Sequence, residues 1–138
     1  MSGPYRSPSC YKFVLASKTW AEAETSCKSM EGYLATLETE EEIIWIKGYR
    51  SYHKNLHDWA WVGGYKKNNK WYWKTPNGDT QMQVADWGEG EPNGGSLENC
   101  LSLFPQNSQI PAKLWFQFND GSCNFPTNYI CEKQKSLL

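Results

Sequence analysis

The feature that most constrains this chain is the wide spacing of its five cysteines. They stand at positions 10, 27, 100, 123 and 131, and no two of them form a C-x-x-C pair. Structural zinc sites and thioredoxin-like redox sites usually need such close spacing, so both are poor interpretations. Scattered cysteines in a small domain are typical of disulfide bonds, which form in oxidising compartments. The sequence therefore predicts a fold held by disulfides in a secreted or extracellular protein.

Chain length and charge narrow the class of protein further. The chain has the length of one domain, and we expect residues 1–138 to form one. Its 14 Lys and Arg against 15 Asp and Glu lack the positive excess of a nucleic-acid surface. No apolar run approaches the roughly 20 residues of a membrane span. The chain opens Met1-Ser2-Gly3-Pro4 without an apolar signal-peptide core, and we interpret the signal peptide as missing from this numbering.

Helix signals lie in the first third of the chain, and strand and loop signals fill the rest. Tyr11–Leu15 is aromatic and β-branched, which predicts a strand. Capping boxes at Thr19–Glu22 and Thr39–Glu42 predict the starts of two helices. Short apolar runs between Gly, Pro and Asn clusters predict further strands, at 59–62, 71–73, 100–104 and 129–131. This order of elements indicates the α+β class.

The stretch from Asp79 to Asn99 is too long for an ordinary connection, and loops beyond about 12–15 residues are usually functional or disordered. Oxygen-bearing side chains gather in it and after the next cysteine: Glu91, Asn93, Glu98, Asn119 and Asp120. Taken singly, each is an ordinary surface or turn residue. If Cys100 and Cys123 pair, however, Glu98 and Asp120 come close together. Such an all-oxygen set suits Ca²⁺, which takes six to eight oxygen ligands, and does not suit zinc.

Five short motifs occur in a fixed order within the span from Cys10 to Lys133. They are Trp61-Val62-Gly63-Gly64, Trp71-Tyr72-Trp73, Trp87-Gly88-Glu89-Gly90-Glu91-Pro92-Asn93, Phe118-Asn119-Asp120 and Tyr129-Ile130-Cys131-Glu132. The ordered set resembles the C-type lectin-like domain family, which writes W-I-G-L, G-x-W-x-W, W-x-x-G-E-P-N and W-N-D. The resemblance implies two helices flanking small antiparallel sheets, with a long calcium-binding loop region. It also implies the disulfides Cys27–Cys131 and Cys100–Cys123.

The resemblance further implies what the five oxygen-bearing side chains do. In sugar-binding members they hold one Ca²⁺ and contact two vicinal hydroxyls of a sugar: Glu91, Asn93, Glu98, Asn119 and Asp120. In that family Glu-Pro-Asn goes with mannose, glucose, N-acetylglucosamine and fucose, and Gln-Pro-Asp goes with galactose. We therefore expect a Ca²⁺-dependent lectin for mannose-type terminal sugars, without catalysis, in glycan or microbial recognition.

Several alternatives stay open at this point. One is galactose-type specificity, because an extra stretch around Pro105–Lys113 lies next to the site. Aromatic residues within 105–118 are then either a sugar-binding face or part of the core, namely Trp115, Phe116 and Phe118. A sugar-independent protein-binding domain is another alternative, and ice or mineral binding is a third. Asn99 stands where many relatives have Asp, which leaves a second Ca²⁺ open.

The fifth cysteine and the two histidines have no motif partner. Cys10 is either the bridge of a disulfide-linked homodimer or a free thiol. His53 and His57 have helical spacing, and we interpret them as a polar helix end rather than a metal or catalytic pair. Glu89 and Glu91 flank one glycine and make a poor acid–base pair for glycoside hydrolysis.

Overall fold

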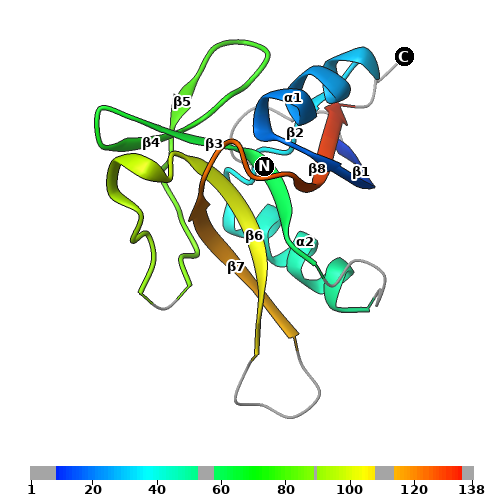
Figure 1. Cartoon of the computed structure of the whole chain (residues 1–138). Coiled ribbons are helices and arrows are strands. Elements are labelled where there is room, and N and C mark those ends of the chain that lie inside the picture. Colours follow the sequence, from blue (N-terminus) through cyan, green and yellow to red (C-terminus); the bar gives the residue numbers. More distant parts are fainter. Residues whose placement is uncertain (1–8, 53–57, 89, 108–113, 135–138) are drawn as a thin grey trace, which may run out of the picture.

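The computed structural model describes residues 9–52, 58–88, 90–107 and 114–134, and the description below concerns these residues. They form two α-helices, a short 3₁₀-helix and one eight-stranded sheet (Figure 1). The helices are α1 (Trp20–Ser29), α2 (Glu40–Tyr52) and the 3₁₀-helix η2 (Gly95–Leu97). The strands are β1 (Ser9–Lys18), β2 (Tyr33–Leu34), β3 (Ala60–Lys67), β4 (Lys70–Trp73), β5 (Thr80–Gln81), β6 (Cys100–Asn107), β7 (Leu114–Gly121) and β8 (Thr127–Gln134). The expected α+β class is confirmed. No helix within the described ranges is long and apolar enough to cross a membrane.

The strands join into one mixed sheet. Its main path runs β1-β8-β3-β4-β5, with β2 beside β8, and β6 pairs with both β3 and β7. The pairing of β3 with β8 is parallel, at Ala60–Asn128 and Trp61–Tyr129. This parallel contact connects the antiparallel groups that the sequence predicts as separate small sheets. In Figure 1, β6 and β7 form a long hairpin that points away from α1.

Helix α1 begins at the predicted capping box. The Thr19 Oγ1 accepts from the Glu22 backbone N–H at 3.3 Å, and the Glu22 Oε1 accepts from the Thr19 N–H at 3.0 Å. Ala23 and Cys27 lie on the buried face of the helix. The disulfide Cys27–Cys131 then fixes that face to β8.

Helix α2 begins at the second predicted box, where the Thr39 Oγ1 accepts from the Glu42 N–H at 3.2 Å. Ile46 is fully buried in the main core. Further along the same helix, the Lys47 Nζ lies 2.5 Å from the Asp86 Oδ2. This ion pair fastens the long segment between β5 and β6 to the helix.

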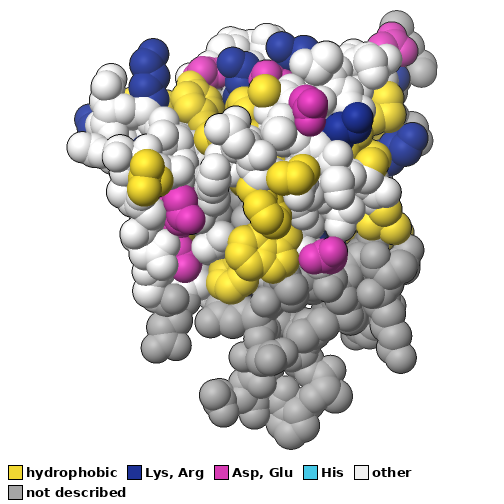
Figure 2. Space-filling view, in the orientation of Figure 1, with side chains coloured by type: hydrophobic (Ala, Val, Ile, Leu, Met, Phe, Trp, Pro, Cys, Tyr) yellow, Lys and Arg dark blue, Asp and Glu magenta, His cyan; other side chains and the backbone are white. Residues whose placement is uncertain are grey.

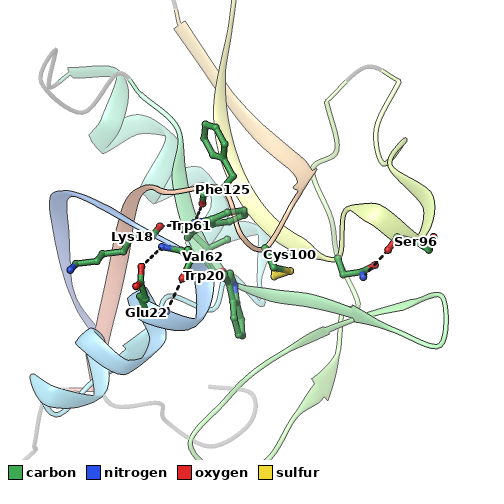
Figure 3. Close-up of a disulfide and its surroundings, with 11 residues drawn as sticks. Lys18, Trp20, Glu22, Trp61, Val62, Ser96, Cys100 and Phe125 are labelled. Carbon is green, nitrogen blue, oxygen red and sulfur yellow. Dashed lines mark hydrogen bonds between the residues drawn. A yellow bond between two sulfur atoms is a disulfide. The ribbon is translucent and has the colours of Figure 1, made fainter.

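Two hydrophobic clusters fill the interior. The larger lies between α2 and the sheet, and its two biggest members are Trp73 and Phe118. The smaller surrounds the disulfides and contains Trp61, which is 1% exposed. Its Nε1 lies 3.1 Å from each of the carbonyl oxygens of Lys18 and Phe125 (Figure 3). Trp61 thereby ties β3 to the loop that precedes β8.

Candidate metal and ligand site

The long segment before β6 is held against β7 by aromatic packing. The rings of Trp87 and Phe118 meet edge to face at 5.9 Å, and Trp71 contacts Trp87 at 5.1 Å. The Phe118 N–H donates to the Asp86 carbonyl at 2.7 Å, and the Phe118 carbonyl accepts from the Gly88 N–H at 3.0 Å. Phe118 is 0% exposed, so its interpretation as a core residue is right and it offers no face to a sugar. The side chains of Trp115 and Phe116 lie outside the described residues.

Three carboxylates converge where this segment reaches the end of β7. Glu91, Glu98 and Asp120 each offer an oxygen within 4.8 Å of the other two. Asp120 is 1% exposed, and its two oxygens accept from the Asn93 N–H at 3.1 Å and the Gly94 N–H at 2.7 Å. One carboxylate therefore both joins the cluster and positions the backbone of the Glu-Pro-Asn motif.

The turn after the motif requires a glycine. A Cβ on Gly94 would lie 2.2 Å from the Cβ of Glu98, far inside any tolerated contact. The absence of a side chain at Gly94 lets Glu98 fold back toward the cluster. From the other side, Cys100–Cys123 holds β6 near the loop that follows β7. With this covalent link formed, Glu98 and Asp120 lie close together, as the sequence predicts if the two cysteines pair.

Burial, mutual repulsion and hydrogen bonds give the three acids different pKa values. Burial raises the pKa of Glu91 to about 7, and its hydrogen bond to Asp120 and the charges of Asp120 and Glu98 add to the rise. Burial and the charge of Asp120 also raise the pKa of Glu98. For Asp120, burial acts to raise the pKa, but hydrogen bonds from Glu91 and from the Gly94 and Asn93 N–H groups outweigh it and lower the pKa. Near neutral pH Glu91 is therefore about half protonated, while Asp120 stays ionised.

The donor set fits a hard divalent cation. The Oε1 of Glu91 is buried and has no hydrogen-bond partner among the described residues. An orphaned buried oxygen is costly, and a cation removes that cost by accepting its lone pair. The remaining donors are carboxylate and amide oxygens, which suit Ca²⁺ and are a poor set for zinc.

A pocket of about 410 Å³ opens beside the carboxylates. Four of the five predicted ligands line it, namely Glu91, Asn93, Glu98 and Asn119. Its floor follows a row of paired residues across three strands, Trp61 on β3, Ser102 on β6 and Asn119 on β7. Together with the carboxylate cluster that includes Asp120, the structure brings all five predicted side chains to one place.

The pocket also has residues that the sequence does not single out. Trp59, Ser122, Phe125 and Thr127 also line the pocket, and none of them is an acid. The sequence shows Trp59 only as the start of an apolar run. Phe125 stands in a loop with no motif of its own. Only the fold brings the two together.

The other predicted residues lie elsewhere. Cys10 on β1 is exposed and forms no disulfide within the described part of the chain. The Asn99 side chain donates to the Ser96 carbonyl at 3.1 Å. His53 and His57 fall outside the described residues.

The family follows from a model of the Lectin C-type domain, which matches residues 16–133. The chain belongs to the C-type lectin domain family. This is a family of non-enzymatic carbohydrate-binding domains whose members typically bind Ca²⁺. Among known proteins, this C-type lectin domain is similar to perlucin of Haliotis laevigata, with 32% identity over 130 residues, covering 92% of this chain and 77% of perlucin.

Solved structures share the fold of this C-type lectin domain. SPL-1 in complex with GlcNAc has a TM-score of 0.73 and 26% identity, covering 93% of this chain and 89% of that chain. The herring type II antifreeze protein has a TM-score of 0.71 and 25% identity, covering 96% of this chain and 95% of that chain. One fold therefore serves more than one kind of ligand, and function has to be argued from the site.

Proposed function

We propose that this C-type lectin domain binds a terminal sugar through one Ca²⁺. The observation that carries the proposal is the convergence of Glu91, Glu98 and Asp120 within 4.8 Å, beside a pocket that Asn93 and Asn119 also line. A protein-binding domain with no need of the ion would have no reason to keep three acids together. Three carboxylates held this close repel one another when all are ionised, and a bound cation removes that repulsion.

The five side chains would divide the work between the ion and the sugar. Carboxylate and amide oxygens of Glu91, Asn93, Glu98, Asn119 and Asp120 would hold Ca²⁺. When bound, the ion supplies coordination positions for two vicinal sugar hydroxyls. The carboxylates accept hydrogen bonds from these hydroxyls, and the Asn amide groups donate to them, so each hydroxyl meets both kinds of partner.

The order Glu-Pro-Asn favours mannose, glucose, N-acetylglucosamine and fucose as the terminal sugar. The complex of the related SPL-1 with GlcNAc is consistent with this class. The rival specificity is galactose, which the sequence raises through residues 105–118.

A glycan array probed in millimolar Ca²⁺ and again with EDTA tests the proposal. Binding to mannose, glucose, N-acetylglucosamine or fucose ends that EDTA removes is the expected result. EDTA-sensitive binding to galactose would keep the ion site and overturn the specificity. Silence in both buffers would reject sugar binding and favour a protein ligand, to be sought by pull-down.

We further propose that the protein is secreted and that Cys10 links two copies. Cys10 is exposed on β1. In a secreted protein, an exposed cysteine without a partner in its own chain meets an oxidising environment, in which it can pair with the same cysteine of a second copy. Two linked sites raise avidity by about 10²–10⁴ where the geometry permits. Light scattering of the wild type and the Cys10→Ser variant should give a dimer that the substitution converts to a monomer. A monomeric wild type, purified without reductant, would reject the dimer.

A further inference from the structure

The pocket beside the carboxylates has two chemically different ends. One end is formed by the acids and amides of the candidate ion site, and the other carries the aromatic rings of Trp59 and Phe125. These two rings are 38% and 52% exposed, respectively. Figure 2 shows hydrophobic side chains gathered at the centre of this face, with acidic side chains to either side. A group attached to anything bound at the first end would therefore enter the second.

The aromatic end is fixed rather than loose. The Trp59 carbonyl accepts from the Thr127 hydroxyl at 3.0 Å, and the Phe125 carbonyl accepts from the Trp61 Nε1 at 3.1 Å. The Trp59 ring packs at 5.7 Å from Phe104 and at 6.3 Å from Phe125. Both backbones are thus anchored while the rings stay half exposed, and Figure 3 shows the Phe125 ring pointing away from the disulfide. Large rings held outside the core in this way mark a binding surface.

The polar groups at the floor of the pocket are already engaged. The Ser102 hydroxyl donates to the Asn119 carbonyl at 3.4 Å, and the Thr127 hydroxyl and Trp61 Nε1 donate to backbone carbonyls. What this end offers a ligand is therefore mainly aromatic surface. A pyranose ring matches such a surface because one of its faces presents C–H groups while its hydroxyls point outward to water.

We infer that this aromatic end holds the second sugar residue of an oligosaccharide whose terminal residue is bound at the ion site. The inference rests on the proposed function, because the continuity of one pocket is what connects the two sugars. Trp59 supplies the stacking face, and Phe125 closes the side of the ring. The domain would then recognise a disaccharide unit, and its preference for a linkage would come from the aromatic end.

Isothermal titration calorimetry in saturating Ca²⁺ tests this inference. The probes are methyl α-mannoside and the α1-2, α1-3 and α1-6 mannobioses, with methyl β-galactoside and lactose for a galactose-specific site. One disaccharide should bind about 5–10-fold more tightly than its monosaccharide, the range that about 1–1.5 kcal/mol of aromatic contact gives. Trp59→Ala should remove that advantage without changing the monosaccharide affinity, Phe125→Ala should reduce it, and Trp59→Phe should retain part of it.

The control is Ile44→Ala, which trims a 68%-exposed apolar side chain on α2, away from the pocket. It should leave both affinities unchanged. If the disaccharide advantage survives Trp59→Ala and Phe125→Ala, or if the wild type shows none, the second sugar subsite is rejected while the terminal-sugar site stands. An advantage seen for octyl mannoside but for no disaccharide would replace the second sugar with an apolar aglycone. If no monosaccharide or disaccharide binds in Ca²⁺, the proposed function itself fails.

Discussion

Two buried acidic regions of this domain have opposite surroundings. Glu132 on β8 is 1% exposed, and its two oxygens accept from the Ser9 hydroxyl at 2.5 Å and the Thr36 N–H at 3.0 Å. Glu91 is half-buried, its buried Oε1 has no partner among the described residues, and two other carboxylates lie within 4.8 Å. Burial raises the pKa of both groups.

The difference separates an acid that holds the fold together from the acids that we propose as ligands of Ca²⁺. Donors around Glu132 satisfy its oxygens, so that carboxylate joins β1, the segment after β2, and β8 without help from outside. The charges of Asp120 and Glu98 raise the pKa of Glu91, and the buried Oε1 of Glu91 has no hydrogen-bond partner among the described residues. The Cys100–Cys123 disulfide, the absence of a side chain at Gly94 and the packing of Trp87 on Phe118 hold these three acids close together.

The largest expected effects come from cutting the disulfide of each region. Cys27 and Cys131 are 104 residues apart, and removing both with Ala should lower the free energy of unfolding by about 4–5 kcal/mol. Cys100 and Cys123 are 23 residues apart, and the same change should lower it by about 3 kcal/mol. Urea denaturation at low temperature measures both. Calcium titration of the folded proteins should show weaker binding only in the variant that lacks Cys100–Cys123. Weaker binding only in the variant that lacks Cys27–Cys131 would contradict the placement of the ion site beside Cys100–Cys123.

A matched pair of carboxylate-to-amide changes should separate stability from binding. Glu132→Gln keeps the shape but weakens the buried hydrogen bonds of that side chain, so stability should fall by about 1–3 kcal/mol with Ca²⁺ affinity unchanged. Asp120→Asn removes a charge from the cluster, and Ca²⁺ affinity should fall at least about 100-fold. Thermal denaturation and calcium calorimetry on both variants give the four values. Equal losses of Ca²⁺ affinity in the two variants would contradict the assignment of Asp120 as a ligand of the ion.

The affinity for Ca²⁺ should rise with pH, whereas the stability of the fold in EDTA should fall as pH rises. Ca²⁺ binding must displace the proton on Glu91, whose pKa is about 7, so affinity should fall about tenfold for each pH unit below 7. In EDTA the folded protein binds more protons than the unfolded chain between pH 4.5, the ordinary value for Glu, and about 7. Stability in EDTA should therefore fall as pH rises through that window, because the raised pKa disfavours the charged form.

Calorimetry in buffers of different ionisation enthalpy should count about half a proton released per Ca²⁺ near pH 7, rising toward about one near pH 6. Glu91→Gln is the control, because it removes the proton and should flatten the dependence. An affinity unchanged from pH 7 to pH 4.5 in the wild type would reject the carboxylate site.

Local features of the sequence predict local structure well. The capping box of α1 forms as expected, and at α2 the Thr39 hydroxyl caps the Glu42 N–H, because each of these hydrogen bonds spans only three residues. The ordered motifs identify the five oxygen-bearing side chains, and the structure brings them together. Gly94 shows the limit, since the sequence gives a glycine but not the Glu98 side chain that excludes a Cβ there.

Contacts between distant segments could not be predicted in the same way. The parallel pairing of β3 with β8 and the meeting of Trp59 with Phe125 depend on where whole strands lie. Neither residue carries a periodicity or spacing that indicates the other. The aromatic end of the pocket was therefore invisible until the fold was known, whereas the ionic end follows a recognisable motif.

The smallest effect is expected from exchanging the acid and the amide of the Glu-Pro-Asn motif, which tests the sugar preference of the binding region. Glu91→Gln with Asn93→Asp moves one carboxylate by two residues and keeps the total charge of the cluster. It reverses which side of the ion offers a donor and which only accepts, so the favoured arrangement of sugar hydroxyls should change. The ratio of galactose to mannose affinity should rise about 10–100-fold with Ca²⁺ binding retained, as about 1–3 kcal/mol of rearranged hydrogen bonds gives. Trp59→Ala is the matched control, because it alters the same pocket without touching the ion and should leave the monosaccharide ratio constant. A double variant that keeps the parent ranking would move specificity away from residues 91 and 93, toward the residues of 105–118.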